Sequence, residues 1–180
     1  AGTAKVNITP DVPIPMVGYN GRREPFKGVH DDLFARAIVF YDGENKAAVV
    51  SVEICLISDD IWRVVSKGIE QETGIPGENI LLCAVHTHAG PTTDPHYNES
   101  YSDEVKSYVE ELEEKLVKVV KDAIDNLKPA SIGAGKGECR MNINRRARLA
   151  SGGIWLGMNP YGPCDYEVGV VRIDDEYKLS

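Results

Sequence analysis

The stretch Asn79-Ile80-Leu81-Leu82-Cys83-Ala84-Val85 runs directly into His86-Thr87-His88. A short, continuous apolar run of this kind is typical of a central β-strand that is covered on both faces. The Gly90-Pro91 pair that follows ends the strand and leaves its C-terminal end open to solvent. Such a strand needs neighbours in a sheet, and the segments around it supply them.

A hairpin and a helix are predicted immediately before this strand. Leu33 to Tyr41 and Lys46 to Ile54 are two β-prone runs, and the Asp42-Gly43-Glu44-Asn45 segment between them is a hairpin signal. Ser58, followed by two aspartates, has the features of a helix N-cap, and Gly74 has those of a C-cap. The apolar residues between the two caps have helical spacing: Ile61, Val64, Val65 and Ile69.

The rest of the chain alternates between strand-like and helix-like segments. Ser102 to Leu127 has apolar residues at helical spacing and ends before Pro129, which predicts a long amphipathic helix. The remaining segments are predicted as strands at Lys5 to Thr9, Ala130 to Gly135 and Glu167 to Asp174, and as irregular chain at Pro10 to Gly28 and Asn142 to Cys164. The expected fold class is α/β, one layered domain in which a mixed β-sheet is flanked by the two helices, Ser58 to Thr73 and Ser102 to Leu127.

Composition and charge exclude several classes of protein. The chain has 180 residues, of which 42% are hydrophobic and 27% charged, which is enough for one domain with its own core. It contains no run near the roughly 20 apolar residues that a membrane-spanning helix requires. The formal net charge is -8 and the basic residues are scattered, so a nucleic-acid partner is not expected, because its phosphates would be repelled.

The four cysteines form no familiar zinc-ribbon or thioredoxin motif, because no Cys-x-x-Cys pair occurs. Cys55 and Cys83 lie in apolar runs and are expected in the core. A disulfide between Cys139 and Cys164 stays open, so cysteine usage does not decide between a secreted and a cytoplasmic protein. The start at Ala1, without an apolar leader, fits either a processed secreted protein or a trimmed chain.

His86 and His88 are the candidate metal-binding residues. Alternation along an extended strand would point both imidazoles to the same side, towards one cation. Zinc accepts imidazole nitrogen, and a catalytic zinc keeps one position for water. The alternative is that both are ordinary polar residues of the turn that follows a strand. The His-x-His-x-Asp-His pattern of metallo-β-lactamases does not fit, because Asp94 follows His88 too late. Amidohydrolase barrels do not fit either, because there the His-x-His follows the first strand.

Three further segments make a family resemblance specific when they are read with the run from His86 to Pro91. They are Met16-Val17-Gly18-Tyr19, the run from Gly28 to Ala37, and Asn142-Ile143-Asn144-Arg145. In their order and spacing these segments resemble the neutral, non-lysosomal ceramidases. The resemblance extends over nearly the whole chain, and it corresponds to the first part of that family's catalytic domain.

The resemblance implies zinc-dependent hydrolysis of an N-acyl amide bond in a ceramide-like lipid. It implies that His86 binds the zinc cofactor and that His88 lies beside the metal as a catalytic residue. Arg145 corresponds to a family arginine that hydrogen-bonds the substrate or catalytic groups, a role that suits a permanently charged fork. Arg146 and Arg148 are alternatives for that role. Ala89 departs from the serine that many family members have, a change that touches neither histidine.

His30 and Tyr19 are weaker, substrate-binding candidates. His30 follows a glycine-rich loop and precedes a strand, so it could face the site, and Tyr19 lies in a Gly-Tyr turn. A lone histidine, however, is often a packed or capping residue.

The resemblance also implies that part of the site lies outside this chain. Family members supply a second zinc histidine, a glutamate, a tyrosine and a serine from later positions, so the remaining catalytic segment is expected beyond Ser180. A catalytic zinc needs about three protein ligands, and we therefore expect the isolated chain to bind zinc weakly. Two alternatives stay open: a non-catalytic fragment or structural module, and a relative that hydrolyses another amide or ester.

Overall fold

The computed structural model describes residues 1–175 and divides the chain into two compact units, Ala1–Lys128 and a second unit that begins at Pro129. Chain length alone predicts one domain, and that expectation stays a prediction. Among the described residues, no helix is long and apolar enough to cross a membrane.

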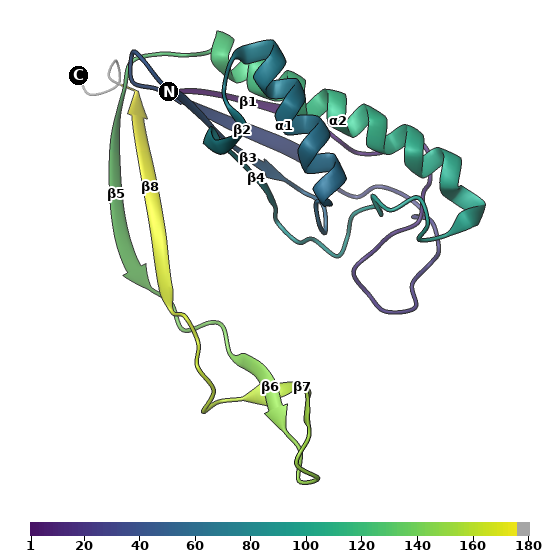
Figure 1. Cartoon of the computed structure of the whole chain (residues 1–180). Coiled ribbons are helices and arrows are strands. Elements are labelled where there is room, and N and C mark those ends of the chain that lie inside the picture. The colour runs from purple at the N-terminus through teal and green to yellow at the C-terminus, as the bar shows by residue number, and fades with distance from the viewer. Residues whose placement is uncertain (176–180) are drawn as a thin grey trace. The chain divides into compact units, whose positions relative to one another are not determined.

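The first unit is built on a four-stranded mixed sheet with the order β1-β2-β3-β4 (Figure 1). The strands are β1 (Gly2–Asn7), β2 (Phe34–Tyr41), β3 (Lys46–Val52) and β4 (Ile80–Ala84). β2 pairs antiparallel with β1 and β3, whereas β3 and β4 are parallel. The predicted hairpin is confirmed, and the Asp42 carboxylate accepts hydrogen bonds from the backbone nitrogens of Glu44 and Asn45 in its turn.

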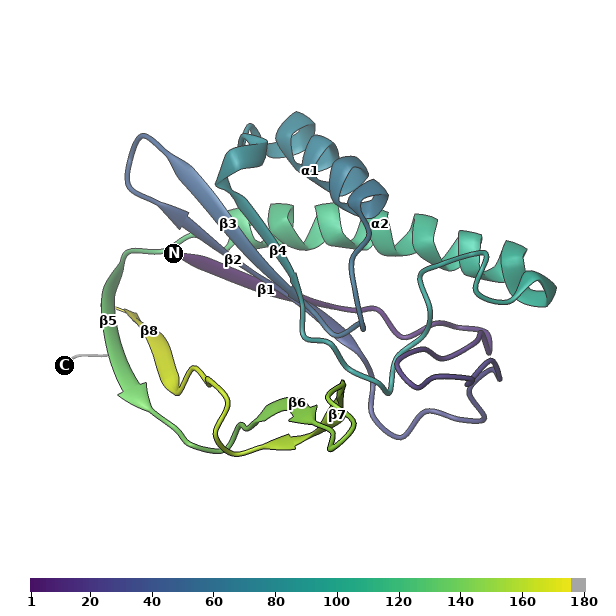
Figure 2. The same ribbon diagram turned by 60° about the horizontal axis from the view of Figure 1, so that its bottom comes forward.

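Two long helices cover one face of this sheet (Figures 1 and 2). They are α1 (Asp59–Thr73) and α2 (Ser102–Asp125), and two short 3₁₀ helices precede β4 and α2, η1 (Gly77–Asn79) and η2 (Glu99–Tyr101). The predicted caps of α1 are confirmed. The Ser58 hydroxyl accepts from the Ile61 nitrogen at 3.3 Å, and Gly74 has φ 72°, the left-handed conformation that a C-cap requires.

The core lies between the sheet and the helices. Every second residue from Ala35 to Val39 in β2 and from Ala48 to Val52 in β3 is buried there, as the two-residue repeat of a strand predicts. The apolar stripe of α2 meets them through Leu112 and Leu116. The helices thus bury one face of the sheet.

Two predictions about the strands of this unit are wrong. β1 spans Gly2–Asn7 rather than Lys5 to Thr9, because its pairing with β2 ends at Asn7 opposite Phe34. β4 was expected to be a central strand covered on both faces, yet within the described chain it pairs only with β3 and leaves Leu81 57% exposed. Within residues 1–175, β4 is therefore the edge strand of this sheet, and both helices lie on one face of it (Figure 1).

The second unit consists of two antiparallel strand pairs. β5 (Ala130–Glu138) pairs with β8 (Glu167–Asp175), and β6 (Asn144–Arg148) pairs with β7 (Ile154–Asn159). Strands at the positions of β5 and β8 are predicted from the sequence, and their pairing is added by the structure. The prediction of irregular chain over Asn142 to Cys164 is wrong. β6 is only five residues long and contains three arginines, so its local signal is weak, and the pairing with β7 makes this segment regular. In residues 1–175 all four cysteines are free thiols.

Candidate functional site

His86 and His88 meet just beyond the C-terminal end of β4. Their ring centroids are 5.0 Å apart and their Nε2 atoms 3.3 Å apart. The predicted reason for this approach, strand alternation, is wrong, because β4 ends at Ala84 and His86 has φ 61°. A non-glycine residue rarely adopts this left-handed conformation, and it is found preferentially at functional positions. A turn, not a strand, therefore brings the imidazoles together.

The backbone of Cys55 orients the His86 ring. Nδ1 of His86 donates to the Cys55 carbonyl oxygen at 2.7 Å, so in the neutral imidazole Nε2 keeps its lone pair. Backbone carbonyls hold metal-binding histidines in this way. The Cys55 thiol is buried and lies 3.7 Å from the same Nδ1 atom. Sequence reasoning assigned Cys55 only to the core, although its place directly after β3, the parallel neighbour of β4, puts it at the same sheet edge.

The histidine pair fits a zinc ion. Two nitrogen ligands at 2.0–2.1 Å from a tetrahedral zinc lie about 3.3 Å from each other, and the two Nε2 atoms already have that separation. Cys55, His86 and His88 each offer a ligand atom, and these three atoms lie within 4.8 Å of one another. Because Nδ1 of His86 is used by the Cys55 carbonyl, the two Nε2 atoms are the better pair. Two nitrogens at this distance share either one metal ion or one proton.

Tyr19 is brought to the same place. Its ring lies edge-on to the His88 ring, with centroids 5.0 Å apart, and its side chain is 60% exposed. Gly18, the residue before Tyr19, packs against the His88 side chain. A Cβ atom at Gly18 would lie only 2.5 Å from the His88 Cγ atom. The loop that sequence reasoning predicted over Pro10 to Gly28 is therefore in contact with the histidine pair.

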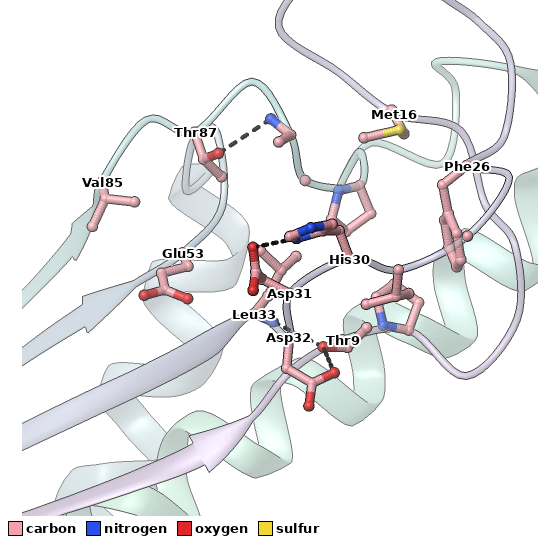
Figure 3. Close-up of a pocket in the computed structure, with 16 residues that line it drawn as sticks. Thr9, Met16, Phe26, His30, Asp31, Asp32, Leu33, Glu53, Val85 and Thr87 are labelled. Carbon is pink, nitrogen blue, oxygen red and sulfur yellow. Dashed lines mark hydrogen bonds and ion pairs between the residues drawn. The ribbon is translucent and has the colours of Figure 1, made fainter.

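His30 lies in a pocket beside the histidine turn rather than on the pair itself (Figure 3). The pocket has a volume of about 520 Å³ and also includes Thr87, the residue between the two histidines. His30 is almost fully exposed and its Nδ1 atom is 2.7 Å from the Asp31 carboxylate. The lining combines apolar and acidic side chains, among them Met16, Phe26, Leu33, Asp31, Asp32 and Glu53.

Arg145 belongs to the second unit, in β6. Its Nε atom donates to the carbonyl oxygen of Gly157 on β7 at 2.6 Å. This hydrogen bond holds the Nε side of the guanidinium against the neighbouring strand of the β6–β7 pair. The catalytic role of Arg145 stays a prediction.

Known proteins resemble this chain in sequence and in fold. The model of the family described as neutral/alkaline non-lysosomal ceramidase, N-terminal, matches residues 1–150. The neutral ceramidase of Pseudomonas aeruginosa is 28% identical over 159 residues, which cover 83% of this chain and 23% of that protein. The neutral ceramidase of Drosophila melanogaster is 30% identical over 152 residues, which cover 80% of this chain and 22% of that protein.

A solved structure has the same fold. The crystal structure of neutral ceramidase from Pseudomonas aeruginosa superposes on 98% of this chain with a TM-score of 0.69 and 21% identity, and the match covers 29% of that structure. The chain thus spans between a fifth and a quarter of the length of these two curated relatives. The mixed sheet with flanking helices is confirmed as an architecture that a larger protein contains.

Proposed function

This chain belongs to the neutral/alkaline non-lysosomal ceramidase family, and we propose that it supplies the His86–His88 part of a zinc-dependent hydrolase site. The reaction is the hydrolysis of an N-acyl amide bond in a ceramide-like lipid. Water is added across the carbon–nitrogen bond, which releases a fatty acid and the amine of a sphingoid base. The observation that carries this proposal is the approach of two imidazole Nε2 atoms to 3.3 Å.

His86 is the proposed metal ligand. The Cys55 carbonyl takes the proton-bearing Nδ1 and leaves the Nε2 lone pair free. The left-handed backbone at His86 costs free energy, and such strain persists where the surrounding structure holds a functional side chain in place. A bound zinc ion supplies a Lewis acid that polarises a carbonyl group and lowers the pKa of water.

His88 is the proposed catalytic neighbour of His86. Its Nε2 atom is close enough to share a proton with the Nε2 atom of His86 or to hold a proton for a reacting oxygen. The same atom could instead become a second metal ligand. Measuring the metal content of a His88→Ala variant separates these two roles.

The pocket beside Thr87 supports an amphiphilic substrate. Apolar side chains such as Met16, Phe26 and Leu33 can bury part of an alkyl chain. Asp31 and Glu53 offer hydrogen-bond acceptors to hydroxyl or amide groups. We propose that His30 and Tyr19 contact the substrate from the pocket and from the histidine pair.

Arg145 completes the proposed set of catalytic residues. With Nε bound to Gly157, its two terminal nitrogens stay available to the substrate carbonyl or a carboxylate product. Its removal should lower the rate of hydrolysis without changing the zinc content, because arginine does not bind zinc.

The first prediction tests the metal site. Protein expressed from the complete gene should contain near-stoichiometric zinc by elemental analysis, and His86→Ala should lose most of that zinc because a ligand is removed. Hydrolysis of a fluorescent N-acyl sphingosine should fall in parallel. His96→Ala is the matched control, because His96 is an exposed histidine of a nearby loop outside the Cys55–His86–His88 group.

Three results distinguish the proposal from its alternatives. Zinc that is retained in His86→Ala contradicts the assignment of the ligand. A protein that binds no zinc even with His86 intact favours a structural module. Zinc-dependent cleavage of simple esters or amides, with ceramide left intact, favours a relative with another substrate.

A further inference from the structure

Arg22 forms an unusual clamp next to the histidine pair. Its Nη2 atom donates to two carbonyl oxygens, those of Val17 and His88, each at 2.6 Å. Hydrogen bonds from a charged donor are stronger than those between neutral groups. Arg22 forms no ion pair within residues 1–175, and its buried Nε atom has no hydrogen-bond partner there. Leaving a buried donor unpaired is unfavourable. Because the guanidinium accepts this cost, we infer that the two hydrogen bonds to carbonyl oxygens determine its position.

The loop that carries Arg22 is anchored to the segment that follows His88. The Val17 nitrogen donates to the Gly90 carbonyl at 3.2 Å, and the Thr92 nitrogen donates to the Pro15 carbonyl at 2.8 Å. The hydroxyl of Tyr97 donates to the carbonyl of Arg22 itself. The segment after the histidine turn therefore fixes the backbone of the Arg22 loop, and the Arg22 side chain binds that turn at the His88 carbonyl.

The side chain of His88 is packed by the same loop. Tyr19 lies edge-on to the His88 ring, and Arg22 lies over the Tyr19 ring with Cζ at 5.1 Å from the ring centre. Gly18, at φ 110°, approaches His88 so closely that no Cβ fits. The backbone of His88 is thus held by Arg22, while its ring is held between Gly18, Tyr19 and His86.

We propose that Arg22 is the positioning residue for His88. By donating to the carbonyls of Val17 and His88, it keeps the His88 imidazole against Gly18 and Tyr19 and therefore beside Nε2 of His86. The inference rests on the proposed function only in so far as His88 serves catalysis. Its structural part, the placement of the ring, is testable without zinc and without substrate.

The first arm of the test measures ring contacts. The 180-residue chain has four histidines, so ring protons can be assigned by NMR with labelled histidine. The wild-type chain, free of zinc, should show contacts of the His88 ring with those of His86 and Tyr19. Arg22→Met should lose them, because it removes both hydrogen bonds. Arg22→Lys should regain them in part, since an ammonium group can donate to both carbonyls.

Arg23→Met is the matched control for the loss of a cation. Arg23 is exposed and lies over the ring of Tyr97 at 4.0 Å. Its Nη1 atom donates to the Arg22 carbonyl at 3.1 Å, and within residues 1–175 its side chain forms no hydrogen bond with His88. Its removal should leave the ring contacts of His88 unchanged.

A pair of glycines keeps the proposal testable if Arg22→Met does not fold. Gly18 and Gly21 belong to the same loop and both have positive φ, so an alanine is strained at either position. A Cβ at Gly21 meets nothing within 4 Å, whereas a Cβ at Gly18 collides with His88. Gly18→Ala should therefore displace the His88 ring, and Gly21→Ala should leave it in place.

The second arm measures catalysis in protein from the complete gene. For a second layer of residues around a metal site, losses are typically about 10-fold to 100-fold. Arg22→Met should lower kcat for N-acyl sphingosine hydrolysis about tenfold. It should change KM by a smaller factor, because His88 is misplaced whereas Tyr19, a proposed substrate contact, loses only the cation over its ring. Arg23→Met and Gly21→Ala should keep the wild-type kcat.

The proposal is overturned if Arg22→Met keeps both the ring contacts and kcat, or if Gly18→Ala and Gly21→Ala alter the His88 ring equally. A wild-type protein that hydrolyses no amide contradicts the proposed function alone. In that case the ring contacts still decide whether Arg22 positions His88.

Discussion

At the scale of single residues, the site depends on hydrogen bonds between a side chain of one segment and a backbone carbonyl of another. The Cys55 carbonyl orients His86, and Arg22 holds the carbonyl of His88. The same device occurs in the core, where the buried Tyr108 hydroxyl donates to the Ile8 carbonyl at 3.0 Å. Burial, with a smaller effect of Glu111, raises the pKa of Tyr108. Its hydroxyl therefore stays protonated and can donate.

Replacing Tyr108 by phenylalanine should destabilise the first unit. The ring keeps its packing, but the buried Ile8 carbonyl loses its donor, which costs about 1 kcal/mol in the free energy of unfolding. Urea denaturation of the variant and the wild type measures this difference. Tyr161→Phe is the control, because Tyr161 is 98% exposed and its loss should have no effect. Equal stability of the two variants would contradict the role assigned to the Tyr108–Ile8 bond.

At the scale of elements, α1 and α2 are joined by packing and by one ion pair. Nζ of Lys121 on α2 lies 2.6 Å from the Glu72 carboxylate on α1. The hydrogen bond from Lys121, followed by its charge, lowers the pKa of Glu72 below its usual value. The same bond raises the pKa of Lys121. Exposed pairs of this kind contribute little, so the apolar stripe and not the ion pair determines how the helices pack.

The Glu72–Lys121 pair should make a small, pH-dependent contribution to stability. Because the pKa of Glu72 is lower in the folded state, its contribution is present above the unfolded value of about 4.3 and is lost as pH falls through the folded value. Glu72→Gln should therefore lower the melting temperature slightly at pH 7, and the difference from wild type should vanish in acid. Glu70→Gln is the matched control, because it removes a nearby carboxylate that forms no ion pair in residues 1–175, and it should leave the melting temperature at pH 7 unchanged.

High salt offers an independent check on the same pair. Screening weakens interactions between exposed charges, so 1 M salt should reduce the effect of Glu72→Gln at pH 7. A difference in melting temperature that is unchanged by both salt and acid would show that Glu72 acts through packing instead.

At the scale of the whole molecule, the two units differ in how they are stabilised. Within residues 1–175, the buried apolar side chains that form the core all belong to Ala1–Lys128. The second unit exposes large apolar residues instead, including Trp155, Leu156 and Met158. Two-stranded pairs without a buried face are at best marginally stable. We therefore expect the first unit to provide most of the folding stability of residues 1–175.

A chain shortened to residues 1–128 should keep the cooperative thermal unfolding of the first unit. Circular dichroism should show one transition close to that of the 180-residue chain, because no buried core residue has been removed. A peptide of residues 129–175 should show no cooperative transition. A shortened chain without cooperative unfolding would mean that the core of the first unit needs the second.

The sequence by itself determined the elements whose signal is local. Helix α1, with its Ser58 and Gly74 caps, the β2–β3 hairpin around Asp42, and the apolar strand before His86 all follow from residues within a few positions of one another. The family was also predictable from short segments in order. Hydrophobic periodicity together with capping and turn residues is enough to predict such features, because the interactions that form them join residues close in sequence.

Only the tertiary structure decided how the site is built. Among the described residues it made β4 an edge strand, it brought the histidines together through a left-handed turn rather than through alternation, and it placed Cys55 and Arg22 beside them. Arg22 and His88 are 66 residues apart, and the bond between them leaves no periodic trace in the sequence. The sequence shows which side chains have suitable chemistry. Tertiary packing determines which of these side chains come into contact. His86 and His88 could be predicted as a pair, whereas the residues that hold them in place could not.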